Sequence, residues 1–261
     1  MPSKSTNWGN YSDYHGPNHN YGSPPSIHVR DSRLALIDRL GISFKAKRCL
    51  DIGTNDGTIS TQLAFDFGAR HVVGVDIDPQ LVSKAEDLLA LRRSRLRPLA
   101  NDGSHPDPQI DYFPMSAVLR HGHNPTPPTL FSSDRPSGVN FIAADWLLST
   151  EPALDGPFDI ILALNVIKWI HLEHLDDGLV AFFRKCQTSL ASGGYLIIQL
   201  QTWESYEKAI RPNAAPHFAE NLQKLQLRPD TSFAKLLQDE GLNLCASSSQ
   251  LRRQINIYRK A

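Results

Sequence analysis

The sequence predicts an α/β fold in which helices cover both faces of a seven-stranded, mostly parallel sheet. Three observations indicate this fold. Short apolar runs typical of buried parallel strands alternate with segments whose apolar residues recur at helical spacing. A loop containing two glycines follows the first apolar run. Polar and aromatic residues gather directly after the fourth run, at the strand ends where open α/β sheets bind ligands.

The segment from Arg48 to Asp78 has the pattern strand, glycine loop, helix and strand, with the helix at about residues 58–67. Glycine tolerates a positive φ and has no Cβ, so Gly53 and Gly57 permit a tight turn and the close approach of a ligand. Asp76 ends the second strand, where an acidic side chain can accept hydrogen bonds from ribose hydroxyls. This unit therefore predicts a nucleoside-binding site.

The charges around the loop favour one kind of nucleoside. Asp51 precedes the loop, Asn55 stands where a dinucleotide-binding loop has its middle glycine, and Asp56 lies at the start of the helix. Two carboxylates would repel a pyrophosphate, but they suit the amino and sulfonium charges of S-adenosylmethionine. We expect this cofactor. NAD(P), and a related fold that binds no ligand, are the alternatives.

The other elements follow from periodicity and from turn residues. The expected helices cover residues 31–40, 79–91, 175–190 and 231–240, and the further expected strands cover residues 139–143, 158–164, 195–200, 242–247 and 254–259. The run Ser192-Gly193-Gly194 is expected to terminate the third of these helices. A loop from Gln201 enters another helix, and residues 211–228 are expected to be irregular.

Two stretches lack this periodicity. Residues 1–26 are polar and aromatic. Two interpretations of this segment are possible: a disordered tail, or a lid that orders over the cofactor or a base. Residues 98–138 hold many prolines and are expected to be an insertion with a disordered middle. The expected organisation is therefore an N-terminal segment, 1–26, and one domain, 27–261, that carries this insertion.

The composition excludes several classes of protein. The formal net charge is zero, which excludes broad coating of a polyanion but permits recognition of one nucleic-acid end. The three cysteines are scattered and lack metal-ligand spacing, so we expect reduced thiols and no metal site. The sequence shows neither a membrane span nor the apolar core of a secretory signal. The expected location is the nucleus or the cytosol, without a membrane partner.

Taken strand by strand, the sequence resembles the Rossmann-like class I methyltransferases. Residues 165–172 contain Lys-Trp-Ile-His-Leu, which resembles the segment after strand four of the methylphosphate capping enzyme family, RNA 5′-phosphate methyltransferases with a Bicoid-interacting domain. Residues 8–14, with Gly-Asn-Tyr-x-x-Tyr, and residues 31–34, Asp-Ser-Arg-Leu, resemble two N-terminal motifs of that family. Residues 73–78 and 203–206 resemble its second-strand motif and a late Trp-x-x-Tyr segment.

The loop pattern and the resemblance together imply a cofactor site for S-adenosylmethionine, with S-adenosylhomocysteine as product. The expected cofactor-binding residues are Arg33, Asp51, Gly53, Asn55, Gly57, Asp76, Ile77, Asp145, Trp146 and Asn165. Asp145 would accept from the adenine amino group while Trp146 covers the ring; helix capping is the alternative for Asp145. An exposed surface arginine is the alternative for Arg33.

The resemblance implies that Lys168 and His171 hold the terminal phosphate of an RNA, with Tyr11 beside the cofactor; these are the expected catalytic residues. The expected RNA-binding residues are Tyr14, Trp169, Trp203 and Tyr206, because aromatic rings stack on RNA bases. Core packing is the alternative for Trp169. A phosphomonoester has a second pKa of about 6, so the nucleophile is already anionic and needs no strong base.

Three stretches depart from the family's usual patterns: residues 55–56 in the glycine loop, residues 15–16, and Gln-Leu-Gln-Thr at 199–202. The resemblance implies a monomeric nuclear enzyme that methylates the 5′-terminal (gamma) phosphate of a small noncoding RNA such as an snRNA. An RNA 5′ end, and a ribonucleoprotein that contains it, are the implied partners. The alternatives are a methyltransferase-like RNA-binding scaffold subunit of a ribonucleoprotein and a small-molecule methyltransferase.

Overall fold

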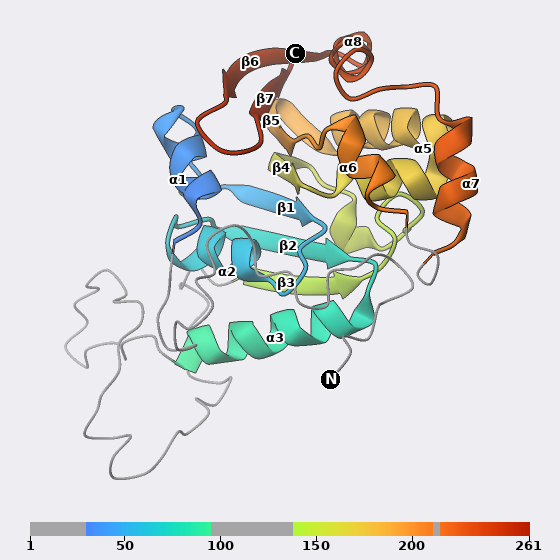
Figure 1. The fold of residues 1–261 in the computed structure, drawn as a ribbon. Coiled ribbons are helices and arrows are strands. Elements are labelled where there is room, and N and C mark those ends of the chain that lie inside the picture. Colours follow the sequence, from blue (N-terminus) through green and yellow to red (C-terminus); the bar gives the residue numbers. More distant parts are fainter. Residues whose placement is uncertain (1–29, 95–137, 211–214) are drawn as a thin grey trace, which may run out of the picture.

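A seven-stranded sheet runs through the computed structural model, which describes residues 30–94, 138–210 and 215–261 (Figure 1). Its strands are β1 (Arg48–Ile52), β2 (His71–Asp76), β3 (Gly138–Ala143), β4 (Phe158–Leu164), β5 (Leu190–Gln199), β6 (Leu242–Ser248) and β7 (Ile255–Lys260). The strand order is β3-β2-β1-β4-β5-β7-β6. β7 pairs antiparallel with β5 and β6, and the other pairs are parallel. The expected mostly parallel sheet is confirmed.

Helices cover both faces of this sheet. Among the described residues they are α1 (Ser32–Arg39), α2 (Thr58–Phe65), α3 (Pro79–Ser94), α5 (Ile167–Ser189), α6 (Trp203–Glu207), α7 (His217–Lys224) and α8 (Phe233–Asp239). Successive strand side chains point to opposite faces. Cys49 accordingly packs in a core cluster with residues of α1 and α2, and Leu50 in a second cluster with residues of α5 and α8.

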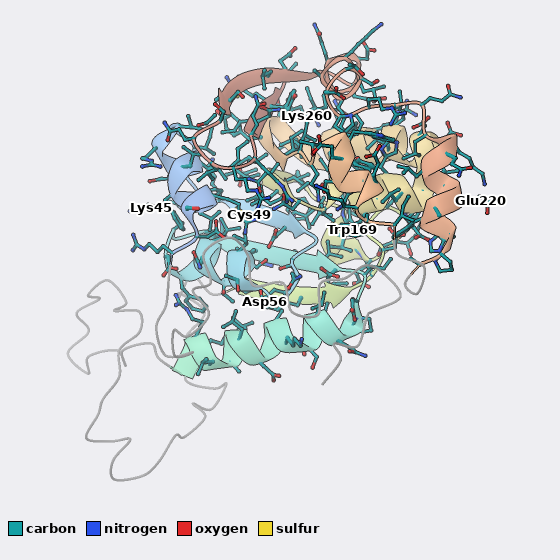
Figure 2. All side chains as sticks on the ribbon, viewed as in Figure 1. Lys45, Cys49, Asp56, Trp169, Glu220 and Lys260 are labelled. Carbon is teal, nitrogen blue, oxygen red and sulfur yellow. The ribbon has the colours of Figure 1, made fainter. Side chains whose placement is uncertain are left out.

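A third apolar cluster lies where α5, α6 and α7 meet. Its buried residues include Leu172 of α5, Tyr206 of α6 and Phe218 of α7, and Trp169 packs against them. In Figure 1 the arrowheads of β1, β2 and β3 point toward the side of the molecule that carries α6 and α7. Figure 2 shows Trp169 at this end of the sheet and Lys45, just before β1, at the opposite end. The third cluster therefore flanks the carboxyl ends of the strands.

Three stretches differ from the sequence-based expectations. The helix expected at residues 175–190 is present as the second part of α5, which ends at Ser189, but another helical part precedes it from Ile167; the two parts meet at Leu175, whose φ is 60°. The first part packs into the third cluster. Residues 192–194, expected to terminate this helix, lie within β5, whose Leu190 pairs with Phe158. The stretch 211–228, expected to be irregular, contains α7, which packs against α5.

Several local expectations are confirmed. β4 has the expected bounds, and the strands β1 and β2 enclose the expected glycine loop and helix. Asp31 is the N-cap of α1, where its side chain accepts from the N–H of Arg33. The expectations for residues 1–26, and for nearly all of the 98–138 insertion, lie outside the described residues. Among the helices that the structure describes, none has the length and apolarity needed to cross a membrane.

Candidate active site

The glycine loop after β1 adopts the tight turn that its sequence predicts. Gly53 and Gly57 have φ values of 74° and 77°, in the left-handed region. Asn55, which stands in place of the usual middle glycine, also has a positive φ of 55°. Asparagine adopts this conformation more readily than most residues, because its short polar side chain hydrogen-bonds locally. The Oδ1 of Asn55 accepts from the N–H of Asp56 at 2.7 Å. The backbone of the loop therefore keeps a positive φ at the position where a dinucleotide-binding loop has its middle glycine.

Asp51 lies beneath this loop, with only 2% of its surface exposed. Its Oδ2 accepts from the hydroxyl of Ser60 at 2.7 Å, and that hydroxyl is 2.8 Å from the hydroxyl of Thr54. Burial raises the pKa of Asp51 to about 6, although the hydrogen bonds of Ser60 and Thr54 and the charge of Arg33 oppose this shift. Asp51 therefore changes charge in mildly acidic solution.

Asp76 closes β2 beside the loop. Its Oδ2 accepts from the N–H of Asn55 at 2.9 Å and its Oδ1 from the N–H of Asp78 at 3.1 Å. An ionised carboxylate has about four acceptor positions, so lone pairs remain for ribose hydroxyls. Burial raises the pKa of Asp76, against the effect of these backbone hydrogen bonds. Ile77, the next residue, is half-buried and offers an apolar surface beside the carboxylate.

Arg33 is buried rather than on the surface, with 6% of its surface exposed. Its Nε and Nη2 donate to the two carboxylate oxygens of Asp31 at 2.9 and 2.7 Å. The N–H of Asp31 donates to Oε1 of Gln62 in α2 at 2.8 Å, which ties the start of α1 to the helix after the glycine loop. The charge of Arg33 lowers the pKa of Asp51, so the guanidinium lies close to the predicted cofactor loop.

Asp145 and Trp146 follow β3 but have different surroundings. Asp145 accepts from the N–H of Leu147 at 2.9 Å and pairs with Nε2 of His174 at 2.7 Å. Burial raises the pKa of Asp145, but these interactions outweigh it and leave the pKa below its ordinary value. Trp146 is 3% exposed and packs edge-on against Phe182 at 5.5 Å. Its ring is thus a core side chain here, and covering an adenine would require it to move.

The glycine loop directly contacts the segment after β4. A Cβ added to Gly53 would lie 2.6 Å from Cγ2 and 2.8 Å from Cβ of Val166, the residue that precedes α5. Such distances are much shorter than an ordinary van der Waals contact, so only glycine permits this packing. The contact brings the expected phosphate-binding segment, which starts two residues later at Lys168, next to the expected cofactor loop.

Lys168 lies in the first turn of α5 and is 7% exposed. Its Nζ donates to the carbonyl oxygen of Ser205 at 3.1 Å and to the Oγ of Ser205 at 3.0 Å. The same Nζ lies 4.3 Å from the ring centroid of Trp169, a cation–π distance. Both Ser205 acceptors are neutral oxygens, and these two contacts orient the ammonium.

His171 is fully buried. Its Nε2 lies 2.8 Å from Oδ1 of Asp176, and its Nδ1 lies 3.3 Å from the hydroxyl of Tyr206. Burial lowers the pKa of His171, against the hydrogen bond and charge of Asp176, so the neutral ring is favoured. Both nitrogens thus face protein groups. Direct donation to an RNA phosphate stays a prediction, and it would require the ring to leave one of these partners.

Asn165 connects β4 to two other segments. Its φ is 66°, and its Oδ1 accepts from Nη1 of Arg253 at 2.6 Å. Its carbonyl oxygen accepts from Nε2 of Gln201 at 2.6 Å, and Oε1 of Gln201 in turn accepts from the N–H of Lys168 at 3.3 Å. Cofactor binding by Asn165 stays a prediction. The hydrogen bonds of Asn165 join the end of β4 to the start of α5.

The aromatic residues expected to bind RNA divide into core and partly exposed groups. Tyr206 is 1% exposed, so stacking on a base would require α6 to move. Trp203 is partly exposed, and its ring stacks on that of Tyr206 with 5.0 Å between the ring centroids. The guanidinium of Arg228 lies over the ring of Trp203. Trp169 is partly exposed and contacts Phe218 of α7 at 5.9 Å. Tyr11 and Tyr14 lie outside the described residues.

Sequence reasoning missed several residues that the fold brings to this edge: Asp176, Gln201, Ser205, Arg228 and Arg253. Ser205 lies within residues 203–206, which resemble a motif of the family, and Gln201 lies in the loop that precedes them, so the motif indicated their neighbourhood. Asp176, Arg228 and Arg253 carried no such signal, because only the tertiary structure brings them to α5 and Trp203.

The loop residues fit S-adenosylmethionine. Asp51, Asp56 and Asp76 make the loop acidic, which suits a cationic ligand and disfavours a pyrophosphate. Gly53 and Gly57 present backbone without a Cβ. Asp76 lies at the carboxyl end of β2 with acceptor capacity for a ribose. The residues present therefore match the charge and the hydrogen-bonding groups of this cofactor.

Comparison with known proteins supports this description. The profile of the Bicoid-interacting protein 3 (Bin3) family matches residues 158–260. The U6 snRNA methylphosphate capping enzyme Amus of Drosophila melanogaster is 30% identical over 245 residues, covering 92% of this chain and 68% of the fly protein. The 7SK snRNA methylphosphate capping enzyme of Mus musculus is 28% identical over 89% of this chain. The chain spans only 36% of the length of that mouse enzyme.

Solved structures share the fold at low sequence identity. An O-methyltransferase family protein from Burkholderia thailandensis has a TM-score of 0.52 and 15% identity, covering 88% of this chain and 55% of that protein. A SAM-dependent methyltransferase from Methanosarcina mazei has a TM-score of 0.50 and 14% identity. The match covers 86% of this chain and 96% of that protein. These similarities establish the class I methyltransferase fold. Together with the sequence relatives, they show that the chain belongs to the Bin3-domain methylphosphate capping enzyme family of SAM-dependent methyltransferases.

Proposed function

We propose that this chain uses S-adenosylmethionine to methylate an oxygen of the 5′-terminal (gamma) phosphate of a small noncoding RNA. The fly and mouse relatives are capping enzymes for U6 and 7SK snRNA, and a relative in Rattus norvegicus, 26% identical over 80% of this chain, is an RNA 5′-monophosphate methyltransferase. The shared chemistry of these relatives is methylation at an RNA 5′ end. We further propose an snRNA substrate and a nuclear site of action, and the names of the two snRNA capping enzymes support both.

One observation in the structure carries the proposal. Val166, the N-cap of α5, packs directly on Gly53, and Lys168 lies two residues later in the first turn of this helix. The loop suited to the cofactor and the cation suited to a phosphate are therefore adjacent at the carboxyl edge of the sheet. This edge is where open α/β sheets place ligands.

The residues present suit methyl transfer to a phosphate. When bound, the cofactor supplies a methyl group on a sulfonium, and attack by a phosphate oxygen leaves the neutral thioether. Lys168 provides one point charge that holds the phosphate, while Ser205 fixes the direction of the ammonium. The phosphate oxygen is already anionic, so the site needs alignment rather than a general base. A single lysine leaves that oxygen more nucleophilic than a cluster of arginines would.

His171 and Gln201 support the alignment of Lys168 through hydrogen bonds that do not involve its ammonium. Gln201 joins the backbone of Lys168 to that of Asn165, and His171 joins α5 to Tyr206 of α6. The helix carrying Lys168 is thereby attached to the helix carrying its acceptor, Ser205. We infer that these residues position the ammonium.

The test is transfer of labelled methyl groups to RNAs of one sequence that carry a 5′-triphosphate, a 5′-monophosphate or a 5′-hydroxyl. The proposal expects label on a phosphorylated RNA and none on the hydroxyl form. Lys168→Ala should lower the rate by about 100-fold, because a charge that positions the reacting group is lost. Lys224→Ala is the matched control, since this lysine is exposed on α7 and pairs with Glu220.

Other outcomes would replace the proposal. RNA binding without cofactor binding or label would favour the scaffold subunit of a ribonucleoprotein. Methyl transfer that proceeds without RNA would favour a small-molecule methyltransferase. Equal rates for Lys168→Ala and Lys224→Ala would remove Lys168 from the mechanism.

A further inference from the structure

Arg228 lies in the segment that joins α7 to α8, and Figure 1 shows the path of this segment. Its N–H donates to the hydroxyl of Ser232 at 3.1 Å. The two preceding residues, Gln226 and Leu227, donate their N–H groups to the carboxylate of Asp176 at 2.8 and 3.2 Å. Asp176 belongs to α5, the helix that begins with the Lys168 segment. The backbone beneath Arg228 is therefore attached to the helix of the proposed phosphate site.

The guanidinium of Arg228 stacks on an aromatic ring. Its Cζ lies 3.3 Å from the ring centroid of Trp203, on α6. α6 also carries Ser205, which accepts from the ammonium of Lys168. In a stacked guanidinium the N–H groups point outward in the ring-parallel plane, so the edge stays available for bidentate binding of an anion. The stack on Trp203 thus fixes the plane of a potential anion-binding fork.

The hydrogen-bonding capacity of Arg228 is incompletely used within the described residues. Its Nη1 is buried and has no hydrogen-bond partner there. The arginines Arg33 and Arg184, by contrast, each pair with a carboxylate, at 2.7 and 2.9 Å. A buried donor of a charged group that lacks an acceptor is unfavourable, because its hydration is lost without replacement. Because Nη1 is buried, an anion that binds it has to displace neighbouring protein groups, and the new hydrogen bond would then remove that cost.

The chemistry of the neighbouring site indicates which anion. Arg228 lies close enough to His171 for its positive charge to lower the pKa of that ring, in addition to the effect of burial. His171 is three residues from Lys168 on α5. An RNA whose reacting phosphate lies at Lys168 carries further phosphates a short distance away along its chain. A guanidinium matches the geometry of a phosphate bidentately.

We propose that Arg228 binds a second phosphate of the RNA, distinct from the phosphate that is methylated. This inference rests on the proposed function. A bidentate arginine on the reacting phosphate would withdraw charge from the nucleophilic oxygen, whereas on a neighbouring phosphate it holds the RNA in register. Two neighbouring groups have this chemistry: an inner phosphate of a 5′-triphosphate and the first internucleotide phosphate.

The experiment compares wild type with Arg228→Gln on three RNAs of one sequence. These carry a 5′-triphosphate, a 5′-monophosphate, or a 5′-triphosphate with a neutral methylphosphonate at the first internucleotide linkage. On the first RNA we expect KM to rise about tenfold with kcat changed less than about twofold, and the salt dependence of binding to weaken by about one phosphate contact. Arg184→Gln is the matched control, because this arginine is exposed on α5 and pairs with Glu240.

The three RNAs locate the contact. If the effect of Arg228→Gln disappears on the monophosphate RNA, Arg228 binds an inner phosphate of the triphosphate. If it disappears on the methylphosphonate RNA, Arg228 binds the internucleotide phosphate. An effect that is equal on all three RNAs, or no larger than that of Arg184→Gln, overturns the proposal.

Two further measurements separate this inference from folding and from the proposed function. Arg228→Lys keeps the charge but not the planar fork, so it should show a smaller loss with the same dependence on RNA. If Arg228→Gln does not fold, this variant supplies the comparison. If wild type transfers no methyl group, the proposed function fails, and binding of the three RNAs measured by fluorescence anisotropy still tests Arg228.

Discussion

Arg253 donates from Nη1 to the Oδ1 of Asn165 at 2.6 Å, across 88 residues of sequence. Arg253 lies just before β7, and Asn165 follows β4 with a positive φ. The carbonyl oxygen of Arg253 also accepts from Nε2 of Gln199 at the end of β5. The loop between β6 and β7 thereby holds the connection that leads from β4 into α5.

This relationship predicts that Arg253 positions Lys168 without touching substrate. In Arg253→Gln, we expect kcat for RNA methylation to fall about tenfold while KM for RNA changes little, because the start of α5 is less well aligned. Arg253→Lys should recover part of the rate. The adjacent Arg252 is exposed, so Arg252→Gln is the control. Equal rates for the two glutamine variants would contradict this role.

We expect substitution by alanine to lower the free energy of unfolding more at Gly53 than at Gly41. Gly53→Ala combines a φ of 74° with a Cβ 2.6 Å from Val166, whereas Gly41→Ala has a φ of 89° and no atom within 4 Å of its Cβ. Gly41→Ala should lower the free energy of unfolding by about 1–2 kcal/mol through backbone strain alone. Gly53→Ala should lose about 1–3 kcal/mol more, because the core is overpacked. Denaturant unfolding measures both, and equal losses would show that the contact with Val166 relaxes.

We expect Asp51 to release a proton when the cofactor binds in mildly acidic solution. Its pKa is about 6 in the folded protein, above the ordinary 3.8, so below about pH 6 the carboxyl holds a proton. A cationic ligand favours the ionised form, so cofactor affinity should increase as pH rises toward this pKa and then level off. Calorimetry at about pH 5.5 in two buffers of different ionisation enthalpy measures the released proton.

Asp51→Asn is the control for this prediction. It removes the titrating group but keeps an oxygen that can accept from Ser60. We expect weaker cofactor binding with a smaller change between about pH 5.5 and 7.5, since Asp76 and the histidines remain. A pH dependence identical to that of wild type would assign the effect to another group.

We expect His171 to make the folded protein less stable against unfolding in acid. Burial lowers its pKa in the folded protein, so the unfolded chain binds a proton more readily. The free energy of unfolding should therefore fall as pH decreases below the ordinary value of 6.5. The pKa of Asp176 is also lowered, but its stabilisation is lost only near its ordinary value of 3.8 and below.

Urea unfolding between about pH 7.5 and 5.5 tests this prediction in wild type and in His171→Gln. The variant is expected to be less stable at neutral pH, since contacts to Asp176 and Tyr206 are weakened, but to lose less stability in acid. His174, whose pKa is raised mainly by its hydrogen bond to Asp145, changes stability in the opposite sense and remains in both proteins. A steeper acid loss in the variant would contradict the neutral state of His171.

The sequence by itself determined the strand, glycine loop, helix and strand around residues 48–76, the bounds of β4 and the family. These features depend on local properties: side-chain periodicity, the freedom of glycine and short motifs. Even the substitution at Asn55 could be understood locally, because asparagine adopts the required positive φ.

Tertiary structure decided the rest of the candidate site. The early start of α5 and the presence of α7 depend on burial in a shared cluster, and the extension of β5 depends on pairing with β4. The hydrogen bond from Arg253 to Asn165, the enclosure of His171 by Asp176 and Tyr206, and the stack of Arg228 on Trp203 all join distant segments. Periodicity reports only which face of an element is apolar, so it cannot specify which polar groups meet across that face.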